Sequence, residues 1–197
     1  MRFFLKAFDE NIGFPLRQRE LTRIIAPHLK GCKRVLDLGS SNGQLAKHLK
    51  DTNPHIQFIG ADTHVPAQTY IPVVKYDGKT LPFKDNSFDC VIVIDVLHHD
   101  TNPEQVLREA KRVSRKLIII KDHYWNNKFE LAILKIADYI GNRPYGIKLP
   151  YNFLQMKEWH RIIKKNGLRI ISTAQFKYSY YHPANQLFFK LEKQRSK

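Results

Sequence analysis

Alternating apolar and mixed stretches of the sequence predict a chain in which strands and helices follow one another. Short apolar runs rich in β-branched residues predict strands, and apolar residues that recur at three- and four-residue spacing predict helices. The predicted strands cover residues 35–38, 57–62, 71–77, 90–94, 117–122, 168–174 and 187–191. The predicted helices cover residues 15–30, 44–50, 103–113, 131–137 and 153–166. This order is typical of an α/β fold with a doubly wound, mostly parallel sheet, which binds ligands beyond the carboxyl ends of its strands.

The first predicted strand ends in a glycine turn that reads Asp37-Leu38-Gly39-Ser40-Ser41-Asn42-Gly43. Gly39 can adopt a positive φ, and Gly43 would let a ligand approach the backbone because it has no Cβ. The N–H groups at the start of the following helix favour polar or anionic ligand groups. A dinucleotide site usually reads G-x-G-x-x-G, but Ser41 stands where a middle glycine is expected. The turn is therefore a poor cradle for a pyrophosphate and a better one for another nucleoside ligand.

Acids stand at the ends of the later strands as well. Asp62 lies nineteen residues beyond Gly43, where a carboxylate can accept hydrogen bonds from ribose hydroxyls. The alternative is that Asp62 only starts the turn before Pro66. Asp77 stands at the end of the next predicted strand, and taken by itself it would be a loop acid without a ligand. The acids at the five strand ends, which we expect to surround one ligand, are Asp37, Asp62, Asp77, Asp95 and Asp122.

These features resemble, in their order along the chain, the motifs of the class I S-adenosylmethionine-dependent methyltransferases, in the small-molecule branch called methyltransferase-11-like. The motifs are the glycine turn, Leu81-Pro82-Phe83 after Asp77, Phe88-Asp89, and Asp95-Val96-Leu97-His98-His99. The resemblance spans residues 34–122 and implies S-adenosyl-L-methionine as the cofactor. It also implies a Rossmann-like, seven-stranded sheet whose last strand is antiparallel. The cofactor-binding residues that it implies are Asp37, Gly39, Ser40, Ser41, Gly43, Asp62, Thr63, Asp77, Gly78, Asp95 and Val96.

Three histidines near the predicted ligand face are candidates for catalysis. Methyl transfer from a sulfonium needs chiefly that the two partners be positioned and water be excluded. A base helps if the acceptor is a hydroxyl, and imidazole titrates near neutral pH, so we consider His98, His99 and His123. The sequence Asp95-x-x-His98-His99 is similar to an acid-x-x-acid-His metal site of quinone-biosynthesis O-methyltransferases. Because His98 replaces the second acid, we predict no metal site.

Residues 123–152 form a connection that is longer than usual, and we expect them to be a lid-like insertion over the ligand face. Four aromatic residues are candidates for binding the substrate there, although each could instead anchor the insertion to the core. They are Tyr124, Trp125, Tyr145 and Tyr151. With this insertion, we expect residues 1–197 to form a single methyltransferase domain.

The composition is strongly basic, with 33 Lys and Arg against 18 Asp and Glu and a net charge of +15. This excess suggests an anionic partner, RNA among them, or only a solvated basic surface. The two cysteines, Cys32 and Cys90, are expected to be free thiols of a reducing compartment. We find no signal peptide and no apolar run long enough to span a membrane, and therefore expect a cytoplasmic protein.

The predicted function is methyl transfer from S-adenosyl-L-methionine to a small-molecule, lipid-linked or sugar-linked acceptor, with oxygen as the expected target atom. Methylation of DNA bases is disfavoured, because Asp95-Val96-Leu97-His98 stands where an Asn/Asp-Pro-Pro-aromatic or a Pro-Cys sequence would be needed. An RNA methyltransferase and a non-catalytic protein that binds the cofactor are the alternatives.

Overall fold

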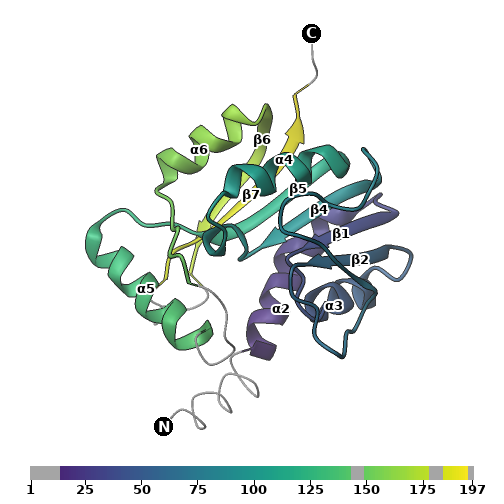
Figure 1. Cartoon of the computed structure of the whole chain (residues 1–197), viewed down its shortest axis with the longest axis horizontal. Coiled ribbons are helices and arrows are strands. Elements are labelled where there is room, and N and C mark those ends of the chain that lie inside the picture. Colours follow the sequence, from purple (N-terminus) through teal and green to yellow (C-terminus); the bar gives the residue numbers. More distant parts are fainter. Residues whose placement is uncertain (1–13, 143–148, 178–183, 195–197) are drawn as a thin grey trace.

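The sheet of the computed structural model has seven strands in the order β3-β2-β1-β4-β5-β7-β6 (Figure 1). The structure describes residues 14–142, 149–177 and 184–194. The strands are β1 (Arg34–Leu38), β2 (Gln57–Asp62), β3 (Val73–Lys75), β4 (Phe88–Ile94), β5 (Ser114–His123), β6 (Leu168–Phe176) and β7 (Gln186–Lys193). The first five strands pair in parallel, and β7 lies antiparallel between β5 and β6. The predicted fold class, a mostly parallel seven-stranded sheet with an antiparallel last strand, is confirmed.

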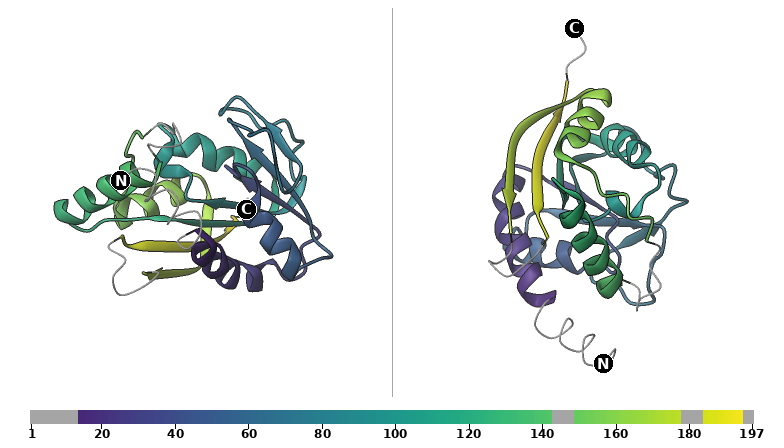
Figure 2. Two further views of the ribbon diagram at one scale, coloured as in Figure 1. Left: turned by 90° about the horizontal axis from the view of Figure 1, so that it is seen from below. Right: turned by 90° about the vertical axis from the view of Figure 1, so that its left-hand side faces the viewer.

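Helices cover both faces of the sheet (Figure 2). The helices are α2 (Phe14–Ile25), η2 (Ala26–Leu29), α3 (Gln44–Thr52), η3 (Leu97–His99), α4 (Pro103–Val113), α5 (Lys128–Asn142) and α6 (Met156–Lys165). One apolar core contains Leu107 of α4 and Trp159 of α6, and the other contains Leu21 of α2 and Leu49 of α3. Apolar strand residues alternate between the two cores, which explains why β4 reads as a continuous apolar run.

Several features differ from those predicted, and the strand predicted at 71–77 is shortened to Val73–Lys75. Residues 63–72 and 76–87 connect β2 to β3 and β3 to β4 without a helix, so strands and helices alternate less regularly than expected. The predicted helix over 15–30 changes from α to 3₁₀ geometry at Ala26, because Pro27 cannot donate the hydrogen bond that an α-helix requires. The helix predicted from residue 153 begins at Met156, where Gln155 and Glu158 form a capping box.

The predicted insertion contains α5, which is longer than the predicted helix at 131–137. It packs through Leu134 against Phe153 and Ala184, with Trp125 and Tyr151 at the margin of this small cluster. Leu154 forms an isolated parallel bridge with Tyr124, the residue after β5, and the backbone N–H of Asn152 donates to the carbonyl oxygen of His98 at 3.1 Å. The insertion is therefore bound to the turn that follows β4. Among the described residues, no helix has the length and apolar character needed to cross a bilayer.

The two cysteines lie side by side in the core. Cys32 precedes β1 and Cys90 lies in β4, and both are buried, free thiols, as predicted.

Candidate functional site

The glycine turn after β1 is held by the end of β2. Gly39 donates its N–H to the carbonyl oxygen of Ala61 at 2.7 Å, and Ser41 donates its N–H to Oδ2 of Asp62 at 2.7 Å. Ser41 has φ +50°, a left-handed conformation that costs a non-glycine residue energy and that this hydrogen bond helps to hold. The second oxygen of Asp62 accepts the N–H of His64 at 2.9 Å. Asp62 therefore shapes the turn, in addition to the ribose-binding role predicted for it.

The two glycines of the turn face protein side chains. Gly39 has φ +77°, and a Cβ there would lie 2.3 Å from Cγ2 of Val96, which places Val96 directly against the turn. A Cβ on Gly43 would lie 2.3 Å from Cγ1 of Ile71. The expectation that Gly43 leaves its backbone open to a ligand is therefore wrong, because Ile71 already fills that space. Gly43 is needed for its φ of +75° and for this packing.

Replacing Gly39 with alanine should lower the free energy of unfolding by about 2–4 kcal/mol, because the new Cβ meets Val96 and the φ becomes unfavourable. Gly31→Ala is the matched control, since Gly31 has φ +82° but nothing within 4 Å of an added Cβ. Urea denaturation should show that the control loses only the conformational part, about 1–2 kcal/mol. Equal losses in the two variants would mean that the contact with Val96 is unimportant.

Asp37 is a buried carboxyl group beneath the turn, with 3% of its surface exposed. Burial first, and then the nearby carboxylate of Asp62, raise the pKa of Asp37 from 3.8 to about 7. Within the described part of the chain we find no hydrogen-bond donor to this carboxyl group. The folded protein therefore disfavours the ionised form of Asp37, and a cation bound beside this carboxyl group would stabilise that form.

The other predicted cofactor residues lie around the same end of the sheet. Ser40 is buried, and its side chain lies against Gly60 of β2. Oδ1 of Asp77 accepts the N–H groups of Lys79 and Thr80, both at 2.8 Å, and these bonds lower the pKa of Asp77. Thr63 lies beside Gly78, with its Cγ2 3.3 Å from the position of an added Cβ. The loops after β2 and β3 thus meet at Thr63 and Gly78.

Asp95 follows β4 and is neutralised by the protein itself. Both of its oxygens accept from the ammonium of Lys121, at 2.6 and 2.8 Å, and Oδ2 also accepts from Arg17. Lys121 is fully buried, so its charge and that of Asp95 depend on each other. Lys121 and Arg17 hold the pKa of Asp95 well below its usual range, despite burial. An acid at this strand end does not by itself indicate a ligand.

Asp122 at the end of β5 organises the histidines. Its Oδ1 accepts from Nδ1 of His98 at 2.6 Å and from the N–H of His123 at 2.7 Å, and its Oδ2 accepts the N–H of Leu97 at 3.1 Å. These donors hold the pKa of Asp122 below its usual value although the group is buried. The expectation that all five strand-end acids surround one ligand is therefore wrong for Asp122, which is used to bind η3 to β5.

The three histidines form one cluster. The ring centroid of His98 lies 4.0 Å from that of His99 and 5.2 Å from that of His123. The His98 ring also stacks on the ring of Phe153, with 4.8 Å between the centroids. Asp122 raises the pKa of His98 against the effect of burial. Burial and then Lys121 lower the pKa of His123 to about 4, and burial and then His98 lower that of His99. Of the three side chains, those of His99 and His123 keep about a fifth of their surface exposed.

Comparison with known proteins agrees with this geometry. A family model described as a methyltransferase domain matches residues 36–117, which contain the glycine turn and β4. Residues 36–117 form a methyltransferase domain, and the chain is an S-adenosylmethionine-dependent methyltransferase with the class I fold. Members of this class take their methyl group from S-adenosyl-L-methionine.

Two curated relatives of the methyltransferase cover different shares of it. An uncharacterised protein of Methanocaldococcus jannaschii is 28% identical over 181 residues, 86% of this chain and 79% of that protein. The ubiquinone/menaquinone biosynthesis C-methyltransferase UbiE of Cupriavidus taiwanensis is 27% identical over 140 residues, 61% of this chain and 58% of that protein. The chain thus spans little more than half the length of this relative.

A solved structure shares the fold of the methyltransferase. The 1,6-didemethyltoxoflavin-N1-methyltransferase of Burkholderia thailandensis, with bound substrate and S-adenosylhomocysteine, superposes with a TM-score of 0.68. It is 14% identical, and the match covers 90% of this chain and 78% of that one. At this identity the likeness concerns the fold alone.

The residues of the methyltransferase at the glycine turn fit S-adenosyl-L-methionine. This cofactor carries a sulfonium and an ammonium group, and the buried carboxyl of Asp37 beside Asp62 lacks a compensating cation in the described part of the chain. Asp37, Asp62 and the turn between them would hold the cofactor, which supplies an activated methyl group. Asp77, Thr63 and Gly78 lie on the adjoining loops.

The predicted substrate-binding aromatics of the methyltransferase serve mainly as anchors where they are described. The hydroxyl of Tyr124 donates to Gln175 at 2.8 Å, and its ring is part of the core. Nε1 of Trp125 donates to the carbonyl oxygen of Phe153 at 2.9 Å. Tyr151 packs on the same small cluster, and Tyr145 lies outside the described residues. The alternative considered for these residues, that they hold the insertion in place, is favoured for Tyr124 and Trp125.

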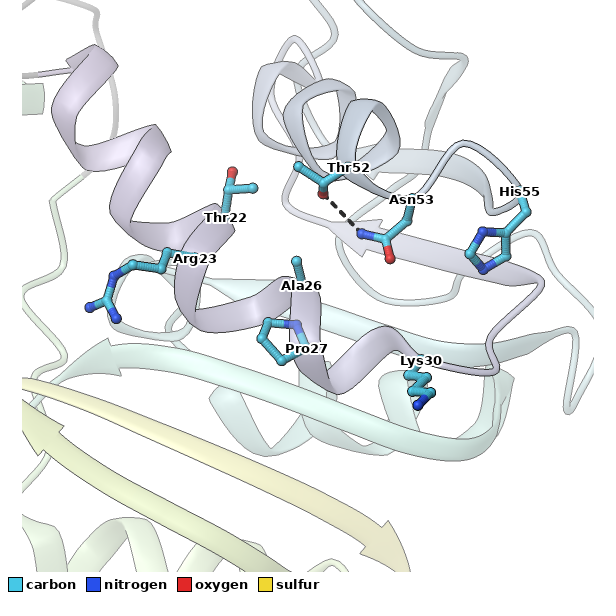
Figure 3. Close-up of a pocket in the computed structure, with 8 residues that line it drawn as sticks. All are labelled: Thr22, Arg23, Ala26, Pro27, Lys30, Thr52, Asn53 and His55. Atoms are coloured by element: carbon cyan, nitrogen blue, oxygen red, sulfur yellow. Dashed lines mark hydrogen bonds between the residues drawn. The ribbon is translucent and has the colours of Figure 1, made fainter.

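An open hollow elsewhere on the methyltransferase is not the cofactor site. It has a volume of about 520 Å³ and lies between α2, η2 and the end of α3, among the residues drawn in Figure 3. Lys30 and His55 on its rim precede β1 and β2, so the hollow opens at the amino ends of the strands. Ligands of open α/β sheets bind at the opposite, carboxyl ends.

Two charged side chains of this region were missed by the sequence reasoning. Lys121 neutralises Asp95 together with Arg17, and Asp138 of α5 faces the histidine cluster. The sequence could have indicated the role of Lys121, since a lysine that follows Leu117–Ile120 in an apolar strand requires a buried partner. Asp138 carries a similar signal, because it interrupts the apolar side of a helix.

Proposed function

We propose that this methyltransferase transfers a methyl group to a hydroxyl oxygen of a small-molecule, lipid-linked or sugar-linked acceptor. The acceptor oxygen forms a bond to the methyl carbon while the carbon–sulfur bond breaks, and its electron pair leaves on the sulfur as neutral S-adenosylhomocysteine. The hydroxyl proton must then pass to a base. The transfer itself requires the protein to bind, orient and exclude water.

The observation that carries this proposal is the histidine cluster beside the glycine turn. Val96 packs on Gly39, and η3 with His98 and His99 follows Val96 at once. His98 is 3% exposed and its Nδ1 is engaged by Asp122, so it serves to position the others. His99 and His123 are the two imidazoles that could reach an acceptor proton. A hydroxyl acceptor is the substrate class that makes use of such groups.

The name of the UbiE relative indicates transfer to carbon, which concerns that protein. A hydroxylated ring that has lost its proton is nucleophilic at oxygen and at the neighbouring carbon, so both outcomes require the same proton acceptor. The product therefore distinguishes the two outcomes, since transfer to oxygen gives a methyl ether and transfer to carbon gives a C-methyl compound.

The test is incubation with S-adenosyl-L-methionine carrying a labelled methyl group, together with fractionated metabolites, lipids and RNA. We expect label in a metabolite or lipid fraction, and a methyl ether in the nuclear magnetic resonance spectrum of the product. Asp62→Ala should reduce transfer at least tenfold, whereas Asp51→Ala, an exposed acid on α3, should leave it unchanged. A C-methyl product would contradict the oxygen assignment, and cofactor binding without transfer to any fraction would favour a non-catalytic protein.

RNA is a second candidate acceptor because the net charge is +15. If RNA is the acceptor, the label should appear in the RNA fraction, and binding should weaken steeply between 50 and 200 mM salt. Binding that does not respond to salt would exclude it.

A further inference from the structure

We propose that His98, His99 and Asp138 form a binding site for one divalent transition-metal ion between η3 and α5. Nε2 of His98 lies 3.8 Å from Oδ1 of Asp138, and Nε2 of His99 lies 3.7 Å from the same oxygen. The three donor atoms lie within 4.8 Å of one another. This site was not predicted from the sequence, because Asp138 comes from the insertion, 39 residues beyond His99.

The spacing of the donor atoms is close to that of a metal site. Two donors about 2.1 Å from one ion at a tetrahedral angle lie about 3.4 Å apart. The observed distances of 3.7 and 3.8 Å need to shorten by only a few tenths of an ångström. Both distances are too long for a hydrogen bond, so neither imidazole donates directly to the carboxylate of Asp138.

The surroundings of His98 fix the nitrogen that faces Asp138. Its Nδ1 is 2.6 Å from Oδ1 of Asp122, and its ring stacks on Phe153. A carboxylate that accepts from one ring nitrogen of a histidine leaves the other nitrogen as a metal donor with a set orientation. Asp122 would thus be the positioning residue behind the ligand His98.

Asp138 is a buried acid that requires a cation. It is 7% exposed, and its Oδ2 has no hydrogen-bond partner among the described residues. Its Oδ1 accepts from Nδ2 of Asn142 at 2.6 Å, which is a neutral donor. Nδ1 of His99 is also buried and unpartnered within the described ranges. A metal ion held by the two imidazoles and Asp138 would supply the positive charge that compensates this carboxylate.

The neighbouring group of Asp95, His98, Asp122 and His123 has similar spacing but a different charge balance. The ammonium of Lys121 lies 2.6 Å from Asp95, and the guanidinium of Arg17 binds the same carboxylate. Two cations already occupy that side of the cluster and would repel a third. On the side of His98 that faces α5, no lysine or arginine of the described ranges forms an ion pair with Asp138.

The donor set selects the class of ion. Two imidazoles and one carboxylate suit zinc, cobalt, nickel or iron(II) better than magnesium or calcium, which prefer oxygen. Three protein ligands leave at least one position for water or another ligand. Because a ligating nitrogen of His99 cannot also take a proton, His123 would remain as the base of the proposed function.

The test is titration of the metal-free, chelator-treated protein with Co²⁺, followed by visible absorption and by calorimetry. We expect one Co²⁺ per chain, with the d–d bands of a low-coordinate site, and competition by Zn²⁺. Asp138→Asn and His99→Ala should each weaken binding at least tenfold, while His55→Ala, an exposed histidine, should bind as the wild type does. The readout requires no acceptor, so it does not depend on the proposed function.

A second measurement separates lost binding from misfolding. Metal-free Asp138→Asn should unfold at the same temperature as the metal-free wild type or above it, because the variant no longer buries an uncompensated charge. Metal should raise the unfolding temperature of the wild type but not that of Asp138→Asn. Absence of stoichiometric Co²⁺ binding to the wild type, or equal binding to folded Asp138→Asn, would overturn the proposal.

Discussion

Lys121→Met is expected to destabilise the protein by about 3–5 kcal/mol. The ammonium of Lys121 is fully buried and lies 2.6 and 2.8 Å from the two oxygens of Asp95. Its removal leaves a largely buried carboxylate that Arg17, on the more exposed side, compensates only in part. Urea denaturation should show a lower midpoint with an unchanged slope.

A double variant and a surface control make this prediction specific. Lys121→Met with Asp95→Asn should recover about half of the loss or more, because no unpaired charge remains and asparagine tolerates the φ of +55° at that position. Lys116→Met makes the same substitution at an exposed position of β5 and should change stability by less than about 0.5 kcal/mol. A double variant as unstable as the single one would show that the loss comes from packing and not from charge.

Asp37→Asn is expected to stabilise the cofactor-free protein at pH 8 by up to about 4 kcal/mol. The pKa of Asp37 is about 7 in the folded protein and near 3.8 in an unfolded chain. The folded state therefore favours the protonated form. The contribution of the protonated carboxyl to the free energy of unfolding is present below about pH 4 and is lost as the pH rises from about 4 to 7. Above about pH 7 the free energy of unfolding no longer changes through this group. The stability advantage of the variant should grow over this interval and level off above it.

The same substitution should weaken binding of S-adenosyl-L-methionine by about tenfold or more at pH 8, since a positively charged cofactor favours the ionised carboxyl. Denaturation from pH 4 to 8 and calorimetric titration check the two effects, with Asp51→Asn as the surface control. In the wild type near pH 7, calorimetry in buffers of different ionisation enthalpy should show proton release on binding. A variant that is less stable than the wild type at pH 8 would refute the assignment of an uncompensated charge to Asp37.

The succession of strands and helices along the chain and the position of the cofactor turn could be predicted because they depend on local signals. Apolar runs define β1, β2, β4 and β5, and the glycines at 39 and 43 mark a turn whose φ values of +77° and +75° few other residues adopt. Elements with weaker local signals were predicted less well. The change of geometry at Pro27 and the start of α6 at Met156 depend on backbone donors and a cap near the helix ends.

The sequence by itself determined the fold class, the family and the end of the sheet where the cofactor belongs, because periodicity and turn chemistry are properties of neighbouring residues. Only the tertiary structure decided which acids are available to a ligand. Lys121 and Arg17 neutralise Asp95, and Asp122 is bonded to His98, whereas no cation or hydrogen-bond donor among the described residues faces the buried carboxyl of Asp37. Asp138 reaches the histidines from a separate helix. Charges interact through space, so their compensation depends on contacts between segments that the linear order of residues does not specify.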